Sequence, residues 1–501
     1  MDYNIKSHKQ YTISLFNVII LLELTLWSGQ TTSGRISFGN RILTWCMLRW
    51  PYIRCQQNDK DNNEFMIKRI EELGVVGAGG GGFPTSVKLQ TKASVVLVNA
   101  AECEPLLHKD KELLLHRFDD VLKGLQIAMK CVGAATGVIG IKNKYHDVFE
   151  AVIPQLPANI STFELTDTYP AGDEFLMVHD ITGKIIPPGG LPKDVDVVVV
   201  NVETLLNIGR DKPVTHKFLS VAGAVRNPVT VRVPIGVSLL EVLELAGGPV
   251  TDSFGMLLGG AMMGKVAKSV DDPVTKTLGG IIVLPNDHPL MHRHLRQWKE
   301  IHLIGKSACD QCRMCTDLCP RYLLGHPIEP HAAMRSLLFG SSEDELVAAT
   351  NYCCECNLCT MFACPEDLDP KNVCVAAKPA ARKLDMFFKG SPEDIRTHPM
   401  ADYRRIPTSR LMLKLGLADF NNVGPLIDAT ISPTSVKLPL KQHAGAPAVA
   451  SVKPGDKVKV GDLIALPPPG ALGARIHASI NGIVKSIDGD VVLEAGSRGS
   501  K

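Results

Sequence analysis

The chain of 501 residues is long enough for several domains, because single hydrophobic cores rarely grow beyond about 250 to 300 residues. Hydrophobic residues make up 45% of it and charged residues 21%, as in ordinary globular proteins. The formal net charge of +2 provides no strongly basic surface, so the composition argues against a nucleic-acid partner.

The first 65 residues differ in character from the rest of the chain. Their apolar run, Leu15 to Trp27, is shorter than the roughly 20 residues of a membrane-spanning helix and contains Asn17 and Glu23. It could be a signal-peptide core, an amphipathic anchor, or sequence translated from upstream of the true start. We favour the last interpretation, because "MIKRIEELGVVGAGG" from Met66 looks like a natural beginning. No convincing membrane span follows it.

Residues 66–215 alternate between strand-like and helix-like segments, which predicts an α/β domain. A short helical pattern leads into the glycine-rich "GAGGGGFPT". The strand-like "SVVLVNAAECEP" follows, and then a charged helix over about residues 106–123. Further along, the β-branched run that begins at Val195 is typical of a strand buried on both faces, and it passes into a helix at Glu203.

The glycine run from Gly77 to Thr85 is a candidate binding loop. Glycine has no Cβ, so such a loop can turn sharply and bring its backbone amides close to an anionic group. The run could equally be a tight turn without a ligand. Polar strand ends in "NAAECEP", "YPAGDEF" and "VVNVET" favour a binding site, because ligands of open α/β sheets gather at the carboxyl ends of the strands.

Residues 216–299 contain a compact β-grasp-like module followed by a connector. The sequence "HKFLSVAGAVRNPVTVRVPIGVSLLEVLELAGG" predicts two short strands, a turn at residues 226–228, and a helix that ends at paired glycines.

Residues 300–385 form a small domain that we expect to be helical wherever the cysteines are not. Ten of the fourteen cysteines fall between Cys309 and Cys374, too crowded for mutual disulfides. The first run has the spacing C-x2-C-x2-C-x3-C-P, which is typical of ferredoxins with two [4Fe–4S] clusters. A zinc ribbon would need only two pairs of ligands, and disulfides do not suit a chain of cytosolic character.

In two-cluster ferredoxins the fourth cysteine of each run binds the other cluster. One cluster would therefore be held by Cys309, Cys312, Cys315 and Cys364, and the other by Cys319, Cys353, Cys356 and Cys359. The second run departs from the pattern, because four residues rather than three precede Cys364 and Cys354 offers a spare thiol. We interpret Cys131 and Cys374 as buried apolar residues.

The remaining residues form a connector and a small all-β domain. Residues 386–435 show mixed character. From residue 436 to 501, short strand patterns around "PGD" and "NG" turns predict a barrel-sandwich domain. The complete fold is thus expected to be multidomain, with α/β and α+β parts.

Four segments in chain order resemble the flavin- and NADH-binding motifs of the respiratory complex I flavoprotein subunit and its relatives. They are "GAGGGGFPTSVK", "NAAECEP", "AGDE" and "VVNVET", within residues 66–209. The resemblance implies FMN as a cofactor and NADH as electron donor. The implied flavin contacts are Gly77, Gly79, Gly80, Lys88, Asn99, Glu102, Gly172, Asp173, Glu174, Asn201 and Thr204, and the implied NADH contacts are Phe83 and Glu104.

Three residues depart from the complex I pattern. Ala101 and Cys103 stand where that family usually has an acid and a serine, and Val200 replaces the first of two asparagines. The departures bear on nicotinamide binding more than on the flavin.

The later modules narrow the resemblance. The segment from His216 is similar to the soluble-ligand-binding β-grasp (SLBB) domain, and residues 436–493 resemble a biotinyl/lipoyl-like module without its modifiable lysine. This domain order, over residues 66–498, resembles that of the propanediol-utilisation cobalamin reductases of bacterial microcompartments. The peripheral subunit of the Rnf electron-transport complex is a related family, which usually carries its sandwich at the N-terminal end.

The resemblance implies a short redox chain from NADH through flavin and two [4Fe–4S] clusters to cobalamin. A flavin is needed because nicotinamide gives electrons in pairs and clusters take them singly. The implied partners are NADH, a corrinoid, an adenosyltransferase and shell proteins, with a cytoplasmic location inside a microcompartment. No corrinoid ligand can be named, because the three histidines of "HPLMHRHLRQW" are more typical of a solvated helix face.

Two other functions stay open. One is an electron-transfer subunit of a membrane NADH:ferredoxin complex, as in the Rnf family. The other is a cluster-bearing scaffold whose β-grasp and sandwich modules organise partners, and this function predicts no bound flavin.

Overall fold

The computed structural model describes residues 62–339, 349–383 and 390–496. The interpretation of the leader falls almost entirely on residues outside these ranges. A helix covers residues 62–72, so Met66 lies within a helix. None of the helices in the described ranges is both long and apolar enough to cross a membrane.

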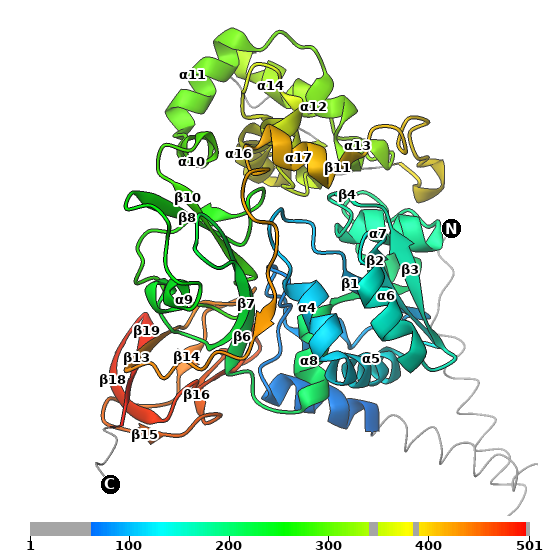
Figure 1. Cartoon of the computed structure of the whole chain (residues 1–501). Coiled ribbons are helices and arrows are strands. Elements are labelled where there is room, and N and C mark those ends of the chain that lie inside the picture. Colours follow the sequence, from blue (N-terminus) through cyan, green and yellow to red (C-terminus); the bar gives the residue numbers. More distant parts are fainter. Residues whose placement is uncertain (1–61, 340–348, 384–389, 497–501) are drawn as a thin grey trace, which may run out of the picture. The chain divides into compact units, whose positions relative to one another are not determined.

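The first domain is built on a parallel sheet with strand order β3-β2-β1-β5 (Figure 1). Its strands are β1 (Val95–Ala100), β2 (Thr136–Lys142), β3 (Ile160–Leu165) and β5 (Val197–Asn201). The chain runs from β1 outward to β3 and then returns to the other side of β1, so the strand order reverses between β1 and β5. Ligands of such sheets bind at this reversal, outside the carboxyl ends of the strands.

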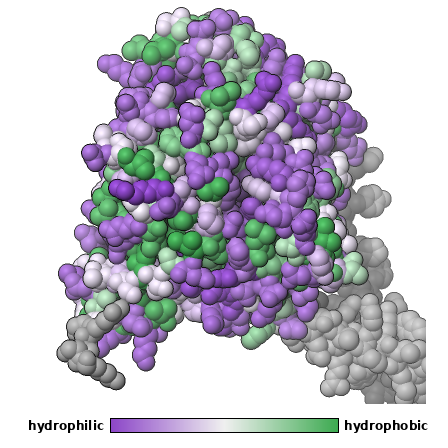
Figure 2. All heavy atoms as spheres, in the orientation of Figure 1, coloured by the Kyte–Doolittle hydropathy of each residue, from purple (hydrophilic) through white to green (hydrophobic). Residues whose placement is uncertain are grey.

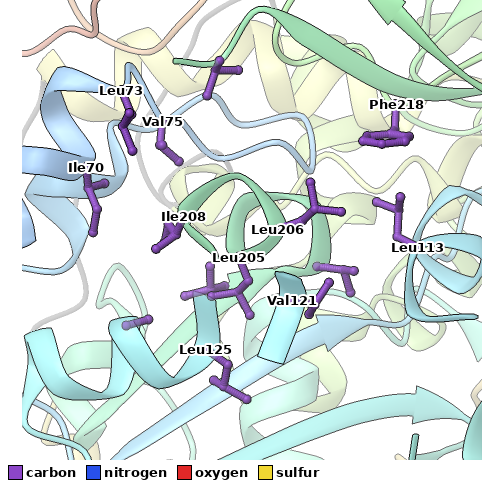
Figure 3. Packing of buried hydrophobic residues seen from close by; sticks show 14 of the residues in the cluster. Ile70, Leu73, Val75, Leu113, Val121, Leu125, Leu205, Leu206, Ile208 and Phe218 are labelled. Atoms are coloured by element: carbon purple, nitrogen blue, oxygen red, sulfur yellow. The ribbon is translucent and has the colours of Figure 1, made fainter. Parts of the chain in front are cut away.

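The helices of this α/β domain are α3 (Thr85–Lys88), α4 (Lys109–His116), α5 (Phe118–Val132), α6 (His146–Val152), α7 (Glu174–Thr182) and α8 (Val202–Arg210). Figure 3 shows Leu205, Leu206 and Ile208 of α8 in the core with Val121 and Leu125 of α5, and all five are buried. The nearly continuous apolar run of β5 is buried over its first four residues, as predicted from its composition.

Helices α5 and α8 approach each other closely through two glycines. A Cβ added at Gly124 would lie 1.9 Å from the Leu205 carbonyl oxygen, and one added at Gly209 would lie 1.9 Å from the Asp120 carbonyl oxygen. Both helices therefore need glycine at the crossing, because no side chain can enter between the two backbones.

The β-grasp domain contains more strands than the sequence predicted. Its sheet has the order β12-β7-β6-β10-β8-β9, and residues 426–427 of the later connector supply its edge strand. The strands are β6 (His216–Gly223), β7 (Val229–Pro234), β8 (Phe254–Leu258), β9 (Lys265–Val266), β10 (Gly280–Pro285) and β12 (Leu426–Ile427). The predicted helix is α9 (Leu239–Leu245), and the paired glycines that follow it, Gly247 and Gly248, both have positive φ.

The cysteine domain is largely helical, as predicted. The connector before it contains α10 (Pro289–Leu295). Its own elements are α11 (Trp298–Ala308), α12 (Met314–Asp317), α13 (Pro320–Leu323), α14 (Pro330–Phe339), η3 (Ala349–Tyr352), η4 (Cys359–Ala363) and α16 (Pro370–Lys383). Most of the expected helix "SEDELVAATNY" lies outside the described residues, and its last part forms the 3₁₀ turn η3.

The connector after the cysteine domain returns to both earlier domains. Its strand β11 (Ile406–Pro407) pairs antiparallel with β4 (Thr168–Tyr169) of the α/β domain, and α17 (Thr408–Lys414) follows. Strand β12 then joins the β-grasp sheet. The connector thus ties the α/β and β-grasp domains together by backbone hydrogen bonds.

The C-terminal sandwich consists of two small sheets. One has the order β13-β19-β18-β15 and the other β14-β16-β17. The strands are β13 (Ser435–Pro439), β14 (Val449–Ala450), β15 (Lys457–Val458), β16 (Leu463–Leu466), β17 (Ile476–His477), β18 (Gly482–Asp488) and β19 (Asp490–Ala495). The face of the molecule in Figure 2 is mainly hydrophilic, with hydrophobic residues in small groups between the polar ones.

A buried lysine joins the sandwich to the rest of the molecule. Lys276 Nζ donates to the carbonyl oxygens of Gly74 (2.7 Å) and Arg475 (2.6 Å), and burial lowers its pKa to about 7. The sandwich also shares an apolar core with the α/β domain. It is therefore part of the packed body of the described chain.

We expect Gly124→Ala to destabilise the protein, because the new methyl group would force α5 and α8 apart. Overpacking of this kind costs about 1–3 kcal/mol or more. The measurement is the apparent melting temperature by circular dichroism. In the control Gly305→Ala, the added methyl in α11 meets only the ends of the Leu337 and Met334 side chains, so the loss should be much smaller. Equal melting temperatures for Gly124→Ala and the unaltered protein would contradict the crossing described above.

Candidate functional site

A cavity of about 700 Å³ lies at the carboxyl ends of β1 and β5, where the strand order reverses. Asn99 and Asn201 are register partners on these two strands, and both line the cavity. One wall comes from the α/β domain, another from the β-grasp domain, and Cys354 and Cys356 of the cysteine domain complete it. The volume lies in the range of small-molecule and cofactor sites.

The glycine loop forms one wall of this cavity. Gly79, Gly80 and Gly81 line it, and a Cβ added at Gly80 or Gly81 would meet no atom within 4 Å. The loop is closed by the Gly77 amide, which donates to the Phe83 carbonyl (2.9 Å). A side chain in this wall would fill space that the glycines leave open, and this space fits an anionic cofactor group close to the backbone.

Nine of the thirteen predicted FMN and NADH contacts line the cavity; they are Gly79, Gly80, Asn99, Glu102, Glu104, Gly172, Asp173, Glu174 and Asn201. The other four, Gly77, Phe83, Lys88 and Thr204, are not in the lining. Thr204 is buried and accepts the Ala78 amide (2.9 Å), and Lys88 Nζ binds Glu174 Oε1 (2.9 Å). The direct contact of all thirteen with a cofactor stays a prediction.

Cys103 makes two hydrogen bonds beside the cavity. Its thiol donates to the Ala101 carbonyl (2.9 Å), and its sulfur accepts the Gly172 amide (2.7 Å). Burial raises its pKa to about 12, so the thiol stays neutral. This cysteine stands where the complex I pattern has a serine. Its two hydrogen bonds join the loop of Ala101 to the loop of Gly172.

Two acids of the cavity have raised pKa values. Burial raises the pKa of Glu104 to about 7, although the amides of Met262 (2.8 Å) and Met263 (2.9 Å) donate to its carboxylate. Burial, and after it the neighbouring Asp110, raises the pKa of Glu102. Glu104 can therefore be protonated near neutral pH, where an exposed glutamate stays charged.

Behind the cavity lies a buried group of charges that the sequence did not reveal. Glu203 pairs with Lys217 and with Lys109 (3.2 Å), and Lys109 pairs with Asp110 (2.5 Å). Asp110 in turn accepts the side-chain amide of Asn201 (2.8 Å). The one available signal was charge in otherwise apolar elements, such as Lys217 within "HKFLSVAG".

Cys309, Cys312, Cys315 and Cys364 surround one small cavity. Burial first, and then the other three thiols, raise the pKa of Cys315 to about 12. These are the four cysteines that the crossed spacing assigned to one cluster. The extra residue before Cys364 is accommodated by η4, a π-helical turn over Cys359–Ala363.

The second cysteine group consists of Cys319, Cys353, Cys356 and Cys359. Cys356 and the spare thiol of Cys354 line the large cavity. Burial raises the pKa of Cys359, and the nearby thiols of Cys353 and Cys319 raise this pKa further. Cys356 interacts with Cys354, Cys319 and Cys359. Cys374 is buried, as predicted, and its thiol also hydrogen-bonds to Cys353, while Cys131 is buried in the α/β core.

The thiols of the first group surround a small volume rather than a point. Within the described residues, no three His, Cys, Asp or Glu side chains are arranged to hold a single metal ion. In an iron–sulfur cluster each thiolate binds a different iron, so the donor set suits a cluster better than one ion.

Arg321 joins the cysteine domain to the cavity wall. Its guanidinium binds Asp173 Oδ2 (2.8 Å) and lies 3.4 Å from the centre of the Phe175 ring. It also interacts with the Cys354 thiol. Asp173 caps α7 by accepting the amides of Phe175 (3.0 Å) and Leu176 (3.2 Å). Its carboxylate is thus engaged by protein on both oxygens.

Tyr169 makes a second link between the two domains. Its hydroxyl donates to the Cys356 carbonyl (2.6 Å), and the side chain is buried. Neither Arg321 nor Tyr169 stood out in the sequence, because each acts across a domain boundary.

Four family models match consecutive parts of the chain. They are the Nuo51 FMN-binding domain over residues 70–210, the SLBB domain over 218–266, the 4Fe-4S dicluster domain over 308–369 and the RnfC barrel sandwich hybrid domain over 424–498. These matches confirm the predicted fold class.

Curated relatives match most of the chain. Cobalamin reductase PduS of Salmonella typhimurium is 45% identical over 427 residues, which are 84% of this chain and 94% of the relative. PduS of Citrobacter freundii is 44% identical with the same coverage. A component of the Na⁺-translocating ferredoxin:NAD⁺ oxidoreductase complex of Acetobacterium woodii is 33% identical over 54% of this chain and 61% of that component.

A flavin-binding domain and an iron–sulfur domain on one chain make this protein an electron-transfer oxidoreductase. Its similarity to PduS extends over nearly the whole length of that protein, across all four domains. The chain belongs to the PduS family of cobalamin reductases.

Proposed function

We propose that the protein is an NADH-dependent cobalamin reductase, which reduces cob(III)alamin to cob(II)alamin and on to cob(I)alamin. FMN, when bound, would supply the exchange between the electron pair of NADH and the single electrons that clusters accept. The observation that carries the proposal is the shared cavity wall: the glycine loop, the predicted cluster ligand Cys356 and the spare thiol of Cys354 line the same space.

The residues of the α/β domain would bind and orient the cofactor. The open glycine wall would take its phosphate, while Asn99, which donates to the Gly172 carbonyl (2.7 Å), keeps two strand-end loops in place. Tyr169 and Arg321 hold the second cysteine group against this site.

The cysteines would hold two [4Fe–4S] clusters in the crossed arrangement. Cys309, Cys312, Cys315 and Cys364 would bind the cluster farther from the cavity. Cys319, Cys353, Cys356 and Cys359 would bind the nearer one. Cys312 is the exposed cysteine of the first group. The cluster farther from the cavity would therefore pass electrons to the acceptor.

The family supports further proposals about the setting of the protein. We propose domain boundaries near residues 215, 299, 385 and 435. We also propose a cytoplasmic location within a propanediol-utilisation microcompartment, with an adenosyltransferase and shell proteins as partners. The match to a component of a ferredoxin:NAD⁺ oxidoreductase complex keeps exchange with ferredoxin as the second candidate function.

The first prediction concerns the donor and the acceptor. Protein purified without oxygen should show a flavin spectrum that NADH bleaches, and it should then reduce cob(III)alamin. The measurement is absorbance with the corrinoid and with ferredoxin in parallel. Turnover of ferredoxin alone would favour the Rnf-like function, and protein that binds no flavin would favour the scaffold.

The second prediction concerns the ligands. Cys312→Ala and Cys356→Ala should each lower the iron content by about half, because each variant loses one of two clusters. Iron analysis and electron paramagnetic resonance (EPR) measure this loss. Cys131→Ala is the control and should keep its iron. If Cys354→Ala lost iron while Cys356→Ala kept it, the assignment within the second run would be wrong.

The third prediction concerns Arg321. Arg321→Gln removes a buried positive charge beside the second cysteine group, and a cation stabilises the reduced, more negative cluster. The midpoint potential of the nearer cluster should therefore fall, by an amount on the order of tens of millivolts. A redox titration followed by EPR measures both clusters, and the far cluster is the internal control. An equal shift of both, or of neither, would argue against the proposed position.

A further inference from the structure

The large cavity has a second wall that the resemblance to complex I did not include. Besides the glycine loop, residues of the β-grasp domain line it, among them Met263, Lys265, Thr275 and Thr277. FMN and a dinucleotide both carry phosphate, and the glycine loop offers one cradle for it. A second phosphate-bearing ligand needs another site for its negative charge.

The acids of the cavity are already partnered by the protein. Asp173 binds Arg321 and Glu174 binds Lys88. Asp110 binds Lys109.

The two remaining acids are held by backbone amides. Glu104 accepts the amides of Met262 and Met263, and Glu102 accepts the Glu104 amide (3.3 Å). The five carboxylates of the cavity lining therefore have protein donors, and the cations beside them are engaged as well.

Lys265 is different from these residues. It is exposed on β9, it lines the cavity, and within the described ranges its Nζ has neither a hydrogen bond nor an ion pair. It is also the sole cationic side chain in the described lining. Thr275 and Thr277 line the same wall and their hydroxyl groups hydrogen-bond to each other (3.2 Å), so one of the two hydroxyl hydrogens stays available beside this charge.

This wall is held rigidly against the α/β domain. The Glu104 carboxylate binds the loop before Lys265 through two amides, and the Asn357 side chain donates to the Met262 carbonyl (2.9 Å). At Gly260 a Cβ would lie 2.2 Å from the Glu104 carboxyl carbon, so the loop needs glycine to make this contact. Lys265 is thus presented from a fixed loop that both neighbouring domains support.

We propose that Lys265 binds the pyrophosphate of the nicotinamide dinucleotide, on the β-grasp wall of the cavity. The inference rests on the proposed NADH dependence and gives the β-grasp domain a direct part in it. It also changes the role predicted for Glu104. Since protein amides occupy its carboxylate, Glu104 positions the loop of Lys265, and Phe83 is absent from the described lining.

The test compares ligand affinities of the protein loaded with FMN and clusters. In Lys265→Gln, the dissociation constants of NAD⁺, by calorimetry, and of NADH, from the concentration dependence of flavin reduction, should rise about tenfold. The affinity for FMN, the affinity for cob(III)alamin and the rate of flavin reduction at saturating NADH should stay unchanged. Lys265→Arg should retain most of the affinity for NAD⁺.

Lys268→Gln is the matched control, because Lys268 is exposed three residues further along and lies outside the cavity lining. It should bind NAD⁺ as the unaltered protein does. An unchanged NAD⁺ affinity in Lys265→Gln would overturn the inference alone. So would a loss confined to FMN or to cob(III)alamin. If NADH does not reduce the flavin of the unaltered protein, the proposed donor is wrong and this inference falls with it.

Discussion

One buried carboxylate holds the two halves of the large cavity together. Glu203 is almost completely removed from water, and a charge in that position is tolerated only when cations satisfy it. Lys109 comes from α4 and Lys217 from the first strand of the β-grasp domain, and Lys217 also donates to the Ala78 carbonyl of the glycine loop (3.0 Å). The loop, the sheet edge and the second domain are therefore fixed around the same oxygen atoms. Asn201 of the cavity wall donates a hydrogen bond to Asp110 of this group. The buried ion pairs therefore help to position the cavity wall.

Local sequence patterns were sufficient to predict these helices, strands and turns. The apolar run of β5, the glycine loop and the helix that ends before Gly247 depend on neighbours in the chain, and the structure has them where the residue types predicted them. The spacing of the first cysteine run likewise predicted which thiols gather, since Cys309, Cys312, Cys315 and Cys364 surround one cavity. What the sequence could not give were contacts across domains. The partner of Asp173 is Arg321, nearly 150 positions away in the chain, and nothing near either residue indicates the other.

The irregular second cysteine run shows how an apparent exception is accommodated. An extra residue in an α-helix would rotate everything after it by about 100°, given 3.6 residues per turn. A π-helical turn takes up that residue locally, and Cys364 reaches the group formed by the first run. The spacing rule therefore concerns the direction of the last thiol rather than the count of residues before it. The ligand contacts that the resemblance to complex I implies for single residues are less secure, because protein groups already bind the carboxylates of Glu104 and Asp173.

The place of the C-terminal sandwich has a consequence for how this architecture changes between families. Lys276 joins the carbonyl of Arg475 in the sandwich to that of Gly74, which lies near the first described helix of the α/β domain. A module in that position is close to the start of the α/β domain and to the end of the connector. Attached before the α/β domain or after the connector, it would reach the same surface and bury the same apolar residues. Transfer of its coding segment from one end of a gene to the other would thus preserve the three-dimensional neighbourhood, and two families with opposite domain orders could share one arrangement in space.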